Sequence, residues 1–484
     1  MLHQAKTYLH TIWGENPKQI RGLNYTLEQQ EAIIYSHLIL MNHGFGDPHP
    51  FWSLGERLLG LWVDSLIDAH CELTSIGEVA YIENLHAYYR EEADRLFSNG
   101  KRTNILRRLL QPLGEKHFNQ LVNGHFDFID LFAGIGGFHQ AMHSVGGHCV
   151  FASEWDKYAR ISYEANYKDI APNLFENDYR YFNCDINDVR PEDIPNFDVC
   201  CGGFPCQAFS IAGLKRGFED TRGTLFFNIA NIVRYKKEHG HAPKVLLLEN
   251  VKGLKSHDKG NTLRVILATL DELRYGYCVE VLNAKYFGVP QNRERLFIVA
   301  WDLDQIPDGD FRFPYGIDEE GNVIYEKERV ATDAKETHIC DIFEPRATID
   351  ASYTISDRMW IGHQERKRRN KENGKGFGYS LFPPDAAYSS TISARYWKDG
   401  SEILIDQSSM GLNPRKLTPT EAGRLQGYNI QGNGWEKMCT GLTTHEQMPF
   451  NIVVSKKEAY HQFGNSVAVP VIKRLAAEIV KQLM

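Results

Sequence analysis

Cys206 is the residue in this sequence best suited to act as a nucleophile. It follows the apolar run Asp198–Cys201 and two glycines, with Pro205 directly before it. In α/β proteins, ligands bind at the carboxyl ends of strands, and proline restricts the backbone there. A free thiol has a pKa of about 8.5, so a nucleophilic thiol at this position needs a neighbouring acid or positive charge. Cys200 and Cys201 are expected to be buried in the strand.

Two polar groups elsewhere in the sequence can supply that help. Glu249 lies near the end of the apolar run Leu246–Val251, where desolvation raises the pKa of a carboxyl group and suits it to general acid catalysis. Arg293 and Arg295 lie just before the apolar run Leu296–Ala300, and their planar guanidinium groups suit a carbonyl or carboxylate. Each also has a purely structural interpretation, Glu249 as a helix cap and the arginines as a salt-bridge network.

A glycine-rich turn in the stretch Asp127–Phe138 indicates a ligand site. Gly134, Gly136 and Gly137 follow an apolar run and allow a tight turn with close approach of a ligand to the backbone. His139 stands where a dinucleotide fingerprint has its third glycine. The shorter form favours a nucleoside ligand without a pyrophosphate.

Two acidic residues complete this nucleoside site. Glu154 comes twenty residues after Gly134, at the end of the next strand-like run, where a carboxylate can accept hydrogen bonds from ribose hydroxyls. Asp185 ends a third strand-like turn and is placed to reach an adenine amino group. A plain tight turn is the alternative for the glycines alone.

An alternation of strand-like and helical runs from residue 126 onward must position these groups. The strand-like runs are Phe128–Phe132, Cys149–Ser153, Asp198–Cys201, Val245–Glu249 and Leu296–Ala300. This alternation predicts an α/β domain with a mostly parallel sheet. Near the end of the chain, Val471–Leu483 has the apolar spacing of an amphipathic helix.

Composition and texture divide the chain further. Its 484 residues are too many for one core. We predict a helical extension over 1–124, a catalytic domain over 125–300, an irregular β-rich domain over 301–415 and a return to the catalytic domain over 416–484. The nine cysteines lack the spacing of a zinc site, so no metal is expected. No apolar run approaches the 18 or so residues of a membrane span, which predicts a cytoplasmic protein.

Six motifs make the chain resemble the bacterial DNA (cytosine-5) methyltransferases. In the family's order they are Phe132-Ala-Gly-Ile-Gly-Gly137, Phe204-Pro-Cys-Gln207, Glu249-Asn-Val251, Gln291-Asn-Arg-Glu-Arg295, Arg415-Lys-Leu-Thr-Pro419 and Gln462-Phe-Gly-Asn-Ser-Val467. The resemblance covers about 125–300 and 416–484. It implies a Rossmann-like methyltransferase domain that uses S-adenosyl-L-methionine. One small departure is Cys184, where the family usually has glycine.

The resemblance also implies roles for individual residues. Cys206 adds to C6 of a cytosine, Glu249 engages N3 and the exocyclic amine, and Arg295 donates to O2 with Arg293 in support. The thiolate turns C5 into an enamine-like carbon that can attack a methyl group. The implied cofactor-binding residues are Phe132, Gly134, Ile135, Gly136, Glu154, Trp155, Asp185, Ile186, Gly203, Pro205, Leu225, Asn465, Ser466 and Val467. The last three place the C-terminal helix against the first strand.

The implied partner is double-stranded DNA, from which the cytosine must be flipped out of the stack. Residues 207–223 resemble the loop that closes over DNA in this family, and 301–415 corresponds to its target-recognition domain. The stretch Thr391–Ile405 is similar to enzymes for sites with adjacent CC/GG, such as CCWGG or GGNNCC. The candidate DNA-binding residues are Gln207, Ser210, Lys215 and Arg216 in the loop, and Arg366, Arg368 and Arg395 in the domain. Arg395 is the candidate for a guanine contact.

Alternatives remain at this point. A eukaryotic branch of the same fold methylates cytosine in tRNA, but it usually carries a second proline where Phe204 stands. A silent DNA-binding regulator would have no need for Cys206, Glu249 and Arg295 together. We expect a monomer, either part of a restriction-modification system with a cognate endonuclease or a solitary methylase. The sequence assigns no role to 1–124 and no exact target.

Overall fold

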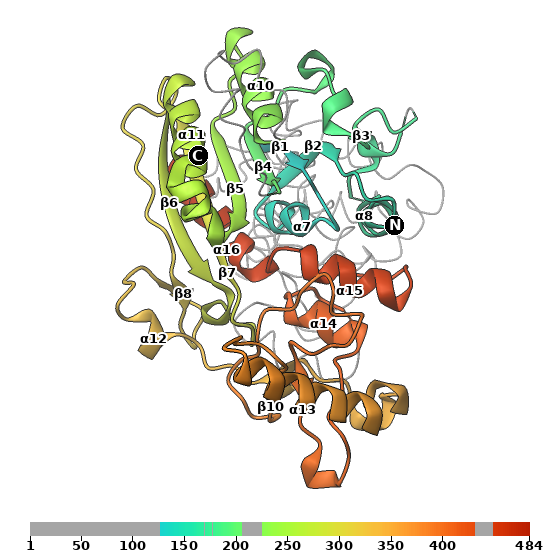
Figure 1. Cartoon of the computed structure of the whole chain (residues 1–484). Helices are drawn as coiled ribbons and strands as arrows, with labels where there is room; N and C mark the ends of the chain where they lie inside the picture. Colours follow the sequence, from blue (N-terminus) through green and yellow to red (C-terminus); the bar gives the residue numbers. More distant parts are fainter. Residues whose placement is uncertain (1–125, 169, 177, 206–224, 431–448) are drawn as a thin grey trace, which may run out of the picture. The chain divides into compact units, whose positions relative to one another are not determined.

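The computed structural model describes residues 126–484 except 169, 177, 206–224 and 431–448 (Figure 1). Residues 127–484 form one compact unit. Its centre is a seven-stranded sheet in the order β3-β2-β1-β4-β5-β7-β6. The strands are β1 (Phe126–Leu131), β2 (Gly147–Ser153), β3 (Phe182–Asn183), β4 (Val199–Gly203), β5 (Val245–Val251), β6 (Tyr275–Asn283) and β7 (Glu294–Asp302).

The strand directions create a binding crevice at one edge of this sheet. β4 runs parallel to both β1 and β5, and β3 runs parallel to β2, whereas β7 lies antiparallel between β5 and β6. The order reverses between β1 and β4, and ligands of open α/β sheets bind at such a reversal, beyond the carboxyl ends of the strands. The predicted mostly parallel sheet is confirmed. The strand-like runs identified in the sequence do not include β6, a strand at the edge of the sheet whose side chains are mostly half-buried.

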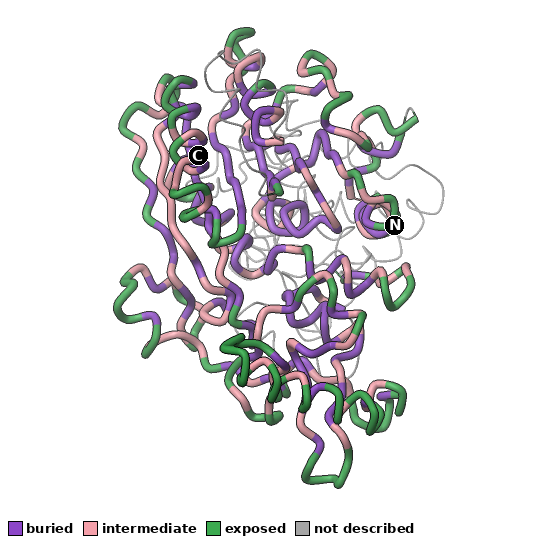
Figure 2. Tube along the Cα trace, in the orientation of Figure 1, coloured by how far each residue is buried: buried purple, intermediate pink, exposed green. Residues whose placement is uncertain are grey.

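Helices surround the sheet and also build a second hydrophobic core. Those around the sheet are α7 (Gly137–His143), α8 (Lys157–Tyr167), α10 (Leu225–Glu238), α11 (Asn261–Glu272) and α16 (Val469–Leu483). The helices α14 (Pro419–Leu425) and α15 (Lys456–Asn465) pack in the second core, which they share with apolar residues of 339–405. The strands β1, β2, β4, β5 and β7 are mostly buried, whereas the edge strand β6 is mostly half-buried, as Figure 2 shows. The predicted amphipathic helix is α16, with Ile472, Leu475 and Ile479 buried. It packs against α7, the helix after β1, rather than mainly against β1 itself.

Residues 301–415 are irregular, as predicted, but they are not rich in strands. The strands and α-helices within it are β8 (Gly316–Ile317), β9 (Val323–Ile324), β10 (Leu381–Phe382), β11 (Leu404–Ile405), α12 (Val330–Asp333) and the 16-residue helix α13 (Asp357–Glu372). Residues Thr391–Tyr396, for example, contain no strand. Their apolar residues Ile392 and Tyr396 are buried one by one, and the chain turns between them where the Tyr396 N–H donates to the Ser393 carbonyl.

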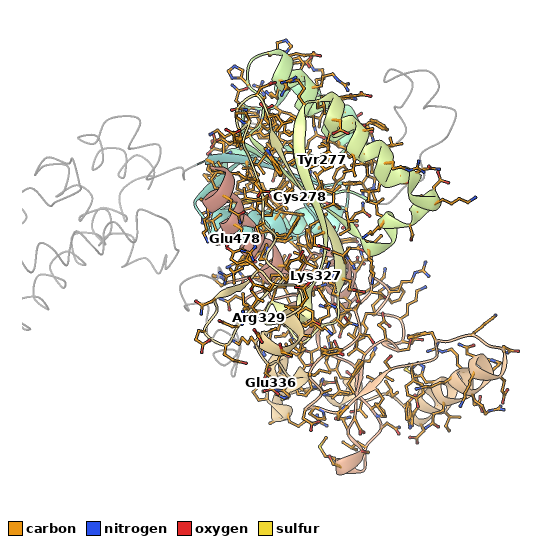
Figure 3. All side chains as sticks on the ribbon, turned by 90° about the vertical axis from the view of Figure 1, so that its left-hand side faces the viewer. Tyr277, Cys278, Lys327, Arg329, Glu336 and Glu478 are labelled. Atoms are coloured by element: carbon orange, nitrogen blue, oxygen red, sulfur yellow. The ribbon has the colours of Figure 1, made fainter. Side chains whose placement is uncertain are left out.

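The first part of this segment lies along the edge of the sheet (Figure 3). Lys327 pairs with Glu280 of β6 at 2.9 Å. The Tyr325 hydroxyl donates to Glu478 of α16 at 2.7 Å. The segment is therefore fixed to both the edge strand and the C-terminal helix.

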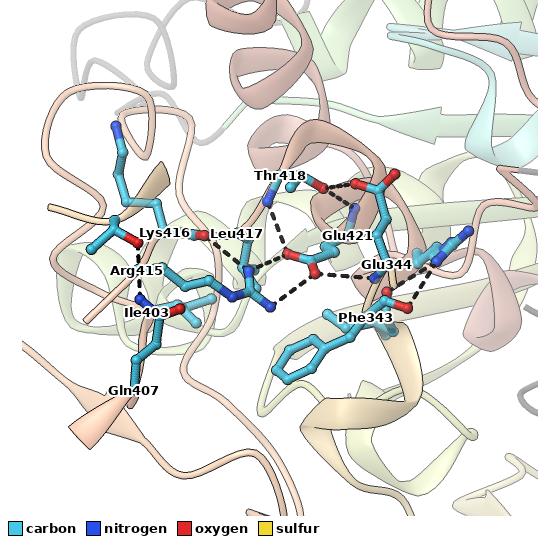
Figure 4. Close-up of polar contacts among 12 residues, drawn as sticks. Phe343, Glu344, Ile403, Gln407, Arg415, Lys416, Leu417, Thr418 and Glu421 are labelled. Carbon is cyan, nitrogen blue, oxygen red and sulfur yellow. Dashed lines mark hydrogen bonds and ion pairs between the residues drawn. The ribbon is translucent and has the colours of Figure 1, made fainter. Parts of the chain in front are cut away.

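A buried polar network fixes the end of the segment to α14 (Figure 4). Arg415 donates twice to Glu421, at 2.7 and 2.9 Å, and both side chains are almost fully buried. Glu421 also accepts the backbone N–H of Thr418, whose hydroxyl caps α14 in return. The Glu344 N–H donates to Glu421 at 3.2 Å. Residues 344, 415 and 421 thus hold the inserted segment and the returning chain in one geometry.

Candidate active site

A tight glycine turn leads from β1 into α7. Phe132, Gly134 and Gly136 all have positive φ, at 57°, 56° and 82°. A side chain on Gly136 would meet the ring of Tyr167 at 2.1 Å, and one on Gly137 would meet Val467 at 2.5 Å. At Gly134 no atom lies within 4 Å of the equivalent position. Gly136 and Gly137 therefore serve close packing, whereas Gly134 leaves open space beside a cavity.

Glu154 links this turn to the end of β2. One of its carboxylate oxygens accepts the Gly134 N–H at 2.7 Å and the other accepts the Asp156 N–H at 2.6 Å. Burial raises the pKa of the Glu154 carboxyl, and these two backbone hydrogen bonds oppose the rise. Asp156 in turn caps α8. The carboxylate is held rigidly by the backbone at the rim of the cavity.

That cavity measures about 930 Å³ and lies beyond the carboxyl ends of β1, β2, β4 and β5. The predicted cofactor residues that line it are Phe132, Gly134, Ile135, Glu154, Trp155, Asp185, Ile186, Gly203, Pro205, Leu225, Asn465, Ser466 and Val467. Gly136 is the exception, because it packs against Tyr167 instead. The Trp155 side chain is 76% exposed at the rim. Asp185 accepts hydrogen bonds from the backbone and side chain of Asn187.

Several lining residues were not among the predicted ones. They include Ala133, Phe138, Cys184, Asn187, Phe204, Asn250, Val251, His461 and Gln462. Phe204 and Asn250 stand inside motifs already quoted, so their positions carried a signal. His461 lies one residue before a quoted motif, and Asn187 follows Asp185 closely. For Phe138 the sequence gives no signal beyond the end of the glycine turn.

Glu249 and Arg295 lie at the other end of the same cavity. Arg295 Nε lies 3.0 Å from Glu249 Oε1. Burial raises the pKa of the Glu249 carboxyl, while Arg295 and Arg293 oppose the rise. Burial also lowers the pKa of Arg295, and Glu249 opposes that change. The cavity therefore joins the glycine turn to a carboxyl group suited to holding a proton and a guanidinium donor.

Asn250 fixes the chain that leads to the candidate nucleophile. Its side-chain amide donates to the Phe204 carbonyl at 2.8 Å, and Gly203 pairs with Glu249 across β4 and β5. Pro205 lines the cavity. Cys206 follows directly but lies outside the described residues, as do the loop candidates Gln207, Ser210, Lys215 and Arg216.

Arg293 does not line the cavity, which corrects its prediction as a catalytic residue. It is 2% exposed, and its guanidinium donates to the carbonyls of Ile392, Gly464 and Ser466. Its position two residues before Arg295 suggested a shared role, but the side chain turns into the contact between 389–395 and the end of α15. A guanidinium surrounded by backbone carbonyls positions chain segments instead of contacting a substrate.

The amino-acid sequence is similar to those of known proteins. A family model described as C-5 cytosine-specific DNA methylase matches residues 126–481. The chain belongs to this family. The Type II methyltransferase M.NlaX of Neisseria lactamica is 48% identical over 359 residues, which cover 73% of this chain and 96% of the relative. M.SsoII of Shigella sonnei is 46% identical over 363 residues, covering 75% and 82%. The protein is thus a DNA (cytosine-5) methyltransferase.

Solved structures support the same fold. The Entamoeba histolytica methyltransferase EhMeth matches with a TM-score of 0.52 at 16% identity, covering 74% of this chain and 98% of that one. The Dnmt2 methyltransferase of S. pombe matches with a TM-score of 0.50 at 18% identity, covering 74% and 99%. In the described part of this methyltransferase, no helix is long and apolar enough to cross a membrane.

The DNA-binding candidates of the inserted segment differ in their surroundings. Arg366 on α13 is half-buried and donates to Asp399 at 2.9 Å and to the Gly378 carbonyl at 3.0 Å. Arg368 is exposed and pairs only with Glu372 on its own helix among the described residues. Arg395 is exposed, and no described residue accepts a hydrogen bond from its guanidinium. Arg368 and Arg395 are therefore available to a ligand, whereas Arg366 is engaged within the protein.

Proposed function

We propose that this methyltransferase transfers a methyl group from S-adenosyl-L-methionine to C5 of a flipped-out cytosine in a short duplex sequence. The transfer passes through a covalent bond between Cys206 and C6 of the cytosine. One observation carries the proposal: a single cavity of about 930 Å³ joins the glycine turn and Glu154 to Glu249 and Arg295. The methyl donor and the target base can therefore bind next to each other in the same cavity.

The residues at one end of the cavity fit S-adenosyl-L-methionine. Glu154 presents a half-buried carboxylate that would accept hydrogen bonds from ribose hydroxyls, and the Asp185 carboxylate lines the cavity where the adenine edge would lie. Phe132 and the exposed Trp155 offer faces for the adenine ring. A volume of this size is at the upper end of the range for cofactor sites, about 300–1,000 Å³, and leaves room for a base. When bound, S-adenosyl-L-methionine supplies an electrophilic methyl group.

At the other end, the protein's own groups activate the cytosine. The Cys206 thiolate forms a bond to C6, and Glu249 gives its proton to N3 as the ring loses its aromatic bond. Arg295 donates to O2 and keeps Glu249 oriented through their ion pair. C5 would then form its bond to the methyl carbon as the bond between that carbon and the cofactor sulfur breaks, and S-adenosylhomocysteine would leave. A base takes the C5 proton, the N3 proton returns to Glu249, and breaking of the C6–sulfur bond releases the Cys206 thiolate and restores the ring.

The inserted segment 301–415 is proposed to read the DNA. The exposed, unengaged guanidinium of Arg395 suits the two acceptors on the major-groove edge of guanine. With the similarity of Thr391–Ile405 noted above, this favours a target with adjacent CC/GG. The loop Gln207–Gly223 would close over the flipped base. The enzyme would act in the cytoplasm as a monomer, either beside a cognate endonuclease for the same site or as a solitary methylase.

Base-resolution mapping of 5-methylcytosine tests this function. The full chain is expressed in a bacterial host that lacks cytosine methylation, beside a Cys206→Ser variant. We expect modification at one short motif with the wild type and none with the variant. An unmethylated genome with soluble wild-type protein would contradict the DNA substrate, and an assay on host tRNA would then test the eukaryotic branch's activity.

A further inference from the structure

We propose that Arg293 is a positioning residue that couples DNA reading by residues 389–395 to cofactor binding at Ser466. The proposal rests on the proposed function, since it assigns the reading of DNA to 301–415 and the cofactor to the cavity. It adds a physical link between the two, through which a bound target tightens the cofactor site.

The guanidinium of Arg293 joins three chain segments. Its Nη1 donates to the Ile392 carbonyl at 3.3 Å. Its Nη2 donates to the carbonyls of Gly464 and Ser466, at 3.2 and 2.5 Å. Ile392 lies three residues before Arg395, the candidate guanine contact, and Ser466 lines the cavity. One buried cation thus contacts both residues 389–395 and the cofactor end of the cavity.

Neighbouring residues of the same segment strengthen the link to the reading loop. Gln291 accepts the Ile392 N–H at 3.1 Å and donates to the Leu425 carbonyl at 2.9 Å. The Asn292 N–H donates to the Ser389 carbonyl at 2.9 Å, and the Thr391 hydroxyl donates to the Asn292 carbonyl at 2.6 Å. Both backbone groups of Ile392 are therefore held by side chains from 291–293. A shift of residues 389–395 would therefore either move residues 291–293 or break these hydrogen bonds.

The cofactor segment also touches the loop directly. A side chain on Gly464 would lie 2.3 Å from the backbone N of Ala394 and from the carbonyl carbon of Ser393. The end of α15 therefore rests on the backbone just before Arg395. Contacts this close behave as packed, discrete arrangements and transmit displacement. Arg295, two residues after Arg293, connects the same segment to Glu249.

Lysine cannot replace this arginine, because one ammonium group does not reproduce a planar fork directed at three carbonyls. Arg293→Lys keeps the charge but loses the bridge. Arg424 offers a matched control. It is also fully buried and donates to carbonyls of the inserted segment, at Ile342 and Phe343, and to the Ile430 carbonyl, three acceptors that lie outside 389–395, and it is not part of the cavity lining.

The experiment measures cofactor affinity with and without DNA. S-adenosylhomocysteine is titrated calorimetrically into the full-length wild type, Arg293→Lys and Arg424→Lys. Each titration is repeated with a duplex selected for wild-type binding from a random pool, and with a scrambled duplex. We expect the selected duplex to tighten binding by at least about fivefold in the wild type and in Arg424→Lys, a common size for such coupling. In Arg293→Lys the factor falls below about twofold.

Three results would overturn the proposal: a wild-type factor near one, an undiminished factor in Arg293→Lys, or an equal loss in Arg424→Lys. If Arg293→Lys fails to fold, Thr391→Ala can be used instead, because it removes only the hydrogen bond from the Thr391 hydroxyl to the Asn292 carbonyl. This variant should reduce the DNA-dependent gain in cofactor affinity by a smaller amount. The readout is binding alone. A wild type that couples but transfers no methyl group would refute the proposed function and leave the bridge standing. Methyl transfer by a wild type that shows no coupling would support the proposed function and refute the role proposed for Arg293.

Discussion

Glu249 and Arg295 form a buried ion pair across β5 and β7, with Arg295 Nε 3.0 Å from Glu249 Oε1. Their side chains are 11% and 18% exposed, and both line the cavity. Burial disfavours the charge on each, while each charge stabilises the other. The carboxyl group is thus oriented by a donor and also inclined to hold a proton, two properties that a general acid requires.

Glu249→Gln is expected to lower the methyl-transfer rate by about 10²–10⁴-fold, the usual contribution of a general acid. The amide cannot give a proton to the ring, but it keeps the shape of the side chain. Binding of S-adenosylhomocysteine should be retained. The measurement is single-turnover transfer of a labelled methyl group to unmethylated DNA. Glu294→Gln is the control, because the neighbouring Glu294 pairs with exposed Lys252 and does not line the cavity. A rate near that of the wild type in Glu249→Gln would remove the proposed acid.

The pH dependence of the same rate gives a second prediction. Burial raises the pKa of Glu249, so the folded enzyme keeps this proton at pH values where an ordinary glutamate, with a pKa of about 4.3, has lost it. The donor disappears as pH rises through the raised pKa, so the Glu249-dependent rate falls with rising pH. Increasing ionisation of a thiol acts in the opposite direction. Single-turnover profiles should show a falling limb in the wild type that is missing from the residual rate of Glu249→Gln; an unchanged limb would assign it to another group.

Alanine at Gly136 and at Gly134 should separate packing from ligand access. Both glycines have positive φ, which costs a residue with a side chain about 1–2 kcal/mol. At Gly136 the new methyl also overlaps the ring of Tyr167, and overpacking adds about 1–3 kcal/mol. Gly134 has open space beside the cavity. We expect Gly136→Ala to lose more free energy of unfolding in denaturant titrations, and Gly134→Ala to lose mainly cofactor affinity. Equal stability losses would contradict this division.

The site was readable from sequence because its residues follow strand ends. Glu154, Glu249 and Gly203 each lie where an apolar run stops, and the parallel order of β1, β4 and β5 brings those ends to one edge. The direction of a side chain was not readable in the same way. Arg293 and Arg295 look equivalent in sequence, yet only Arg295 faces the cavity, because Arg293 meets carbonyls from residues roughly a hundred or more positions away.

The inserted segment was the least predictable part. Its apolar residues do not repeat with the period of a strand or a helix; each fills a separate site among loops, as Ile392 and Tyr396 do. Its fixed geometry depends on long-range polar contacts such as Glu344 with Glu421 and Lys327 with Glu280. A local sequence pattern does not predict such pairs, because the two partners lie in segments that are far apart in the sequence.

Replacing only one member of the Arg415–Glu421 ion pair should strongly destabilise the protein. Its two members are almost fully buried, and removing one partner of a buried pair leaves an uncompensated charge at a cost of about 3–5 kcal/mol. Arg415→Met and Glu421→Gln should each lose this much free energy of unfolding. The double variant should lose less than the sum. Denaturant titrations of the four proteins form the cycle, and additive losses would show that the two side chains act independently.

Arg368 and Arg366, two residues apart on α13, should respond differently to neutralisation. Arg368 is exposed, so Arg368→Gln is expected to leave stability unchanged and to reduce the slope of log affinity against log salt by about 0.9, the loss of one phosphate contact. Arg366→Gln removes the tie to Asp399 and the Gly378 carbonyl and should lower the free energy of unfolding. Fluorescence titration of a labelled duplex over a series of salt concentrations gives the slopes. If Arg366→Gln alone changed the slope, the phosphate contact would belong to the half-buried arginine, and the ion pair with Asp399 would have to open when DNA binds.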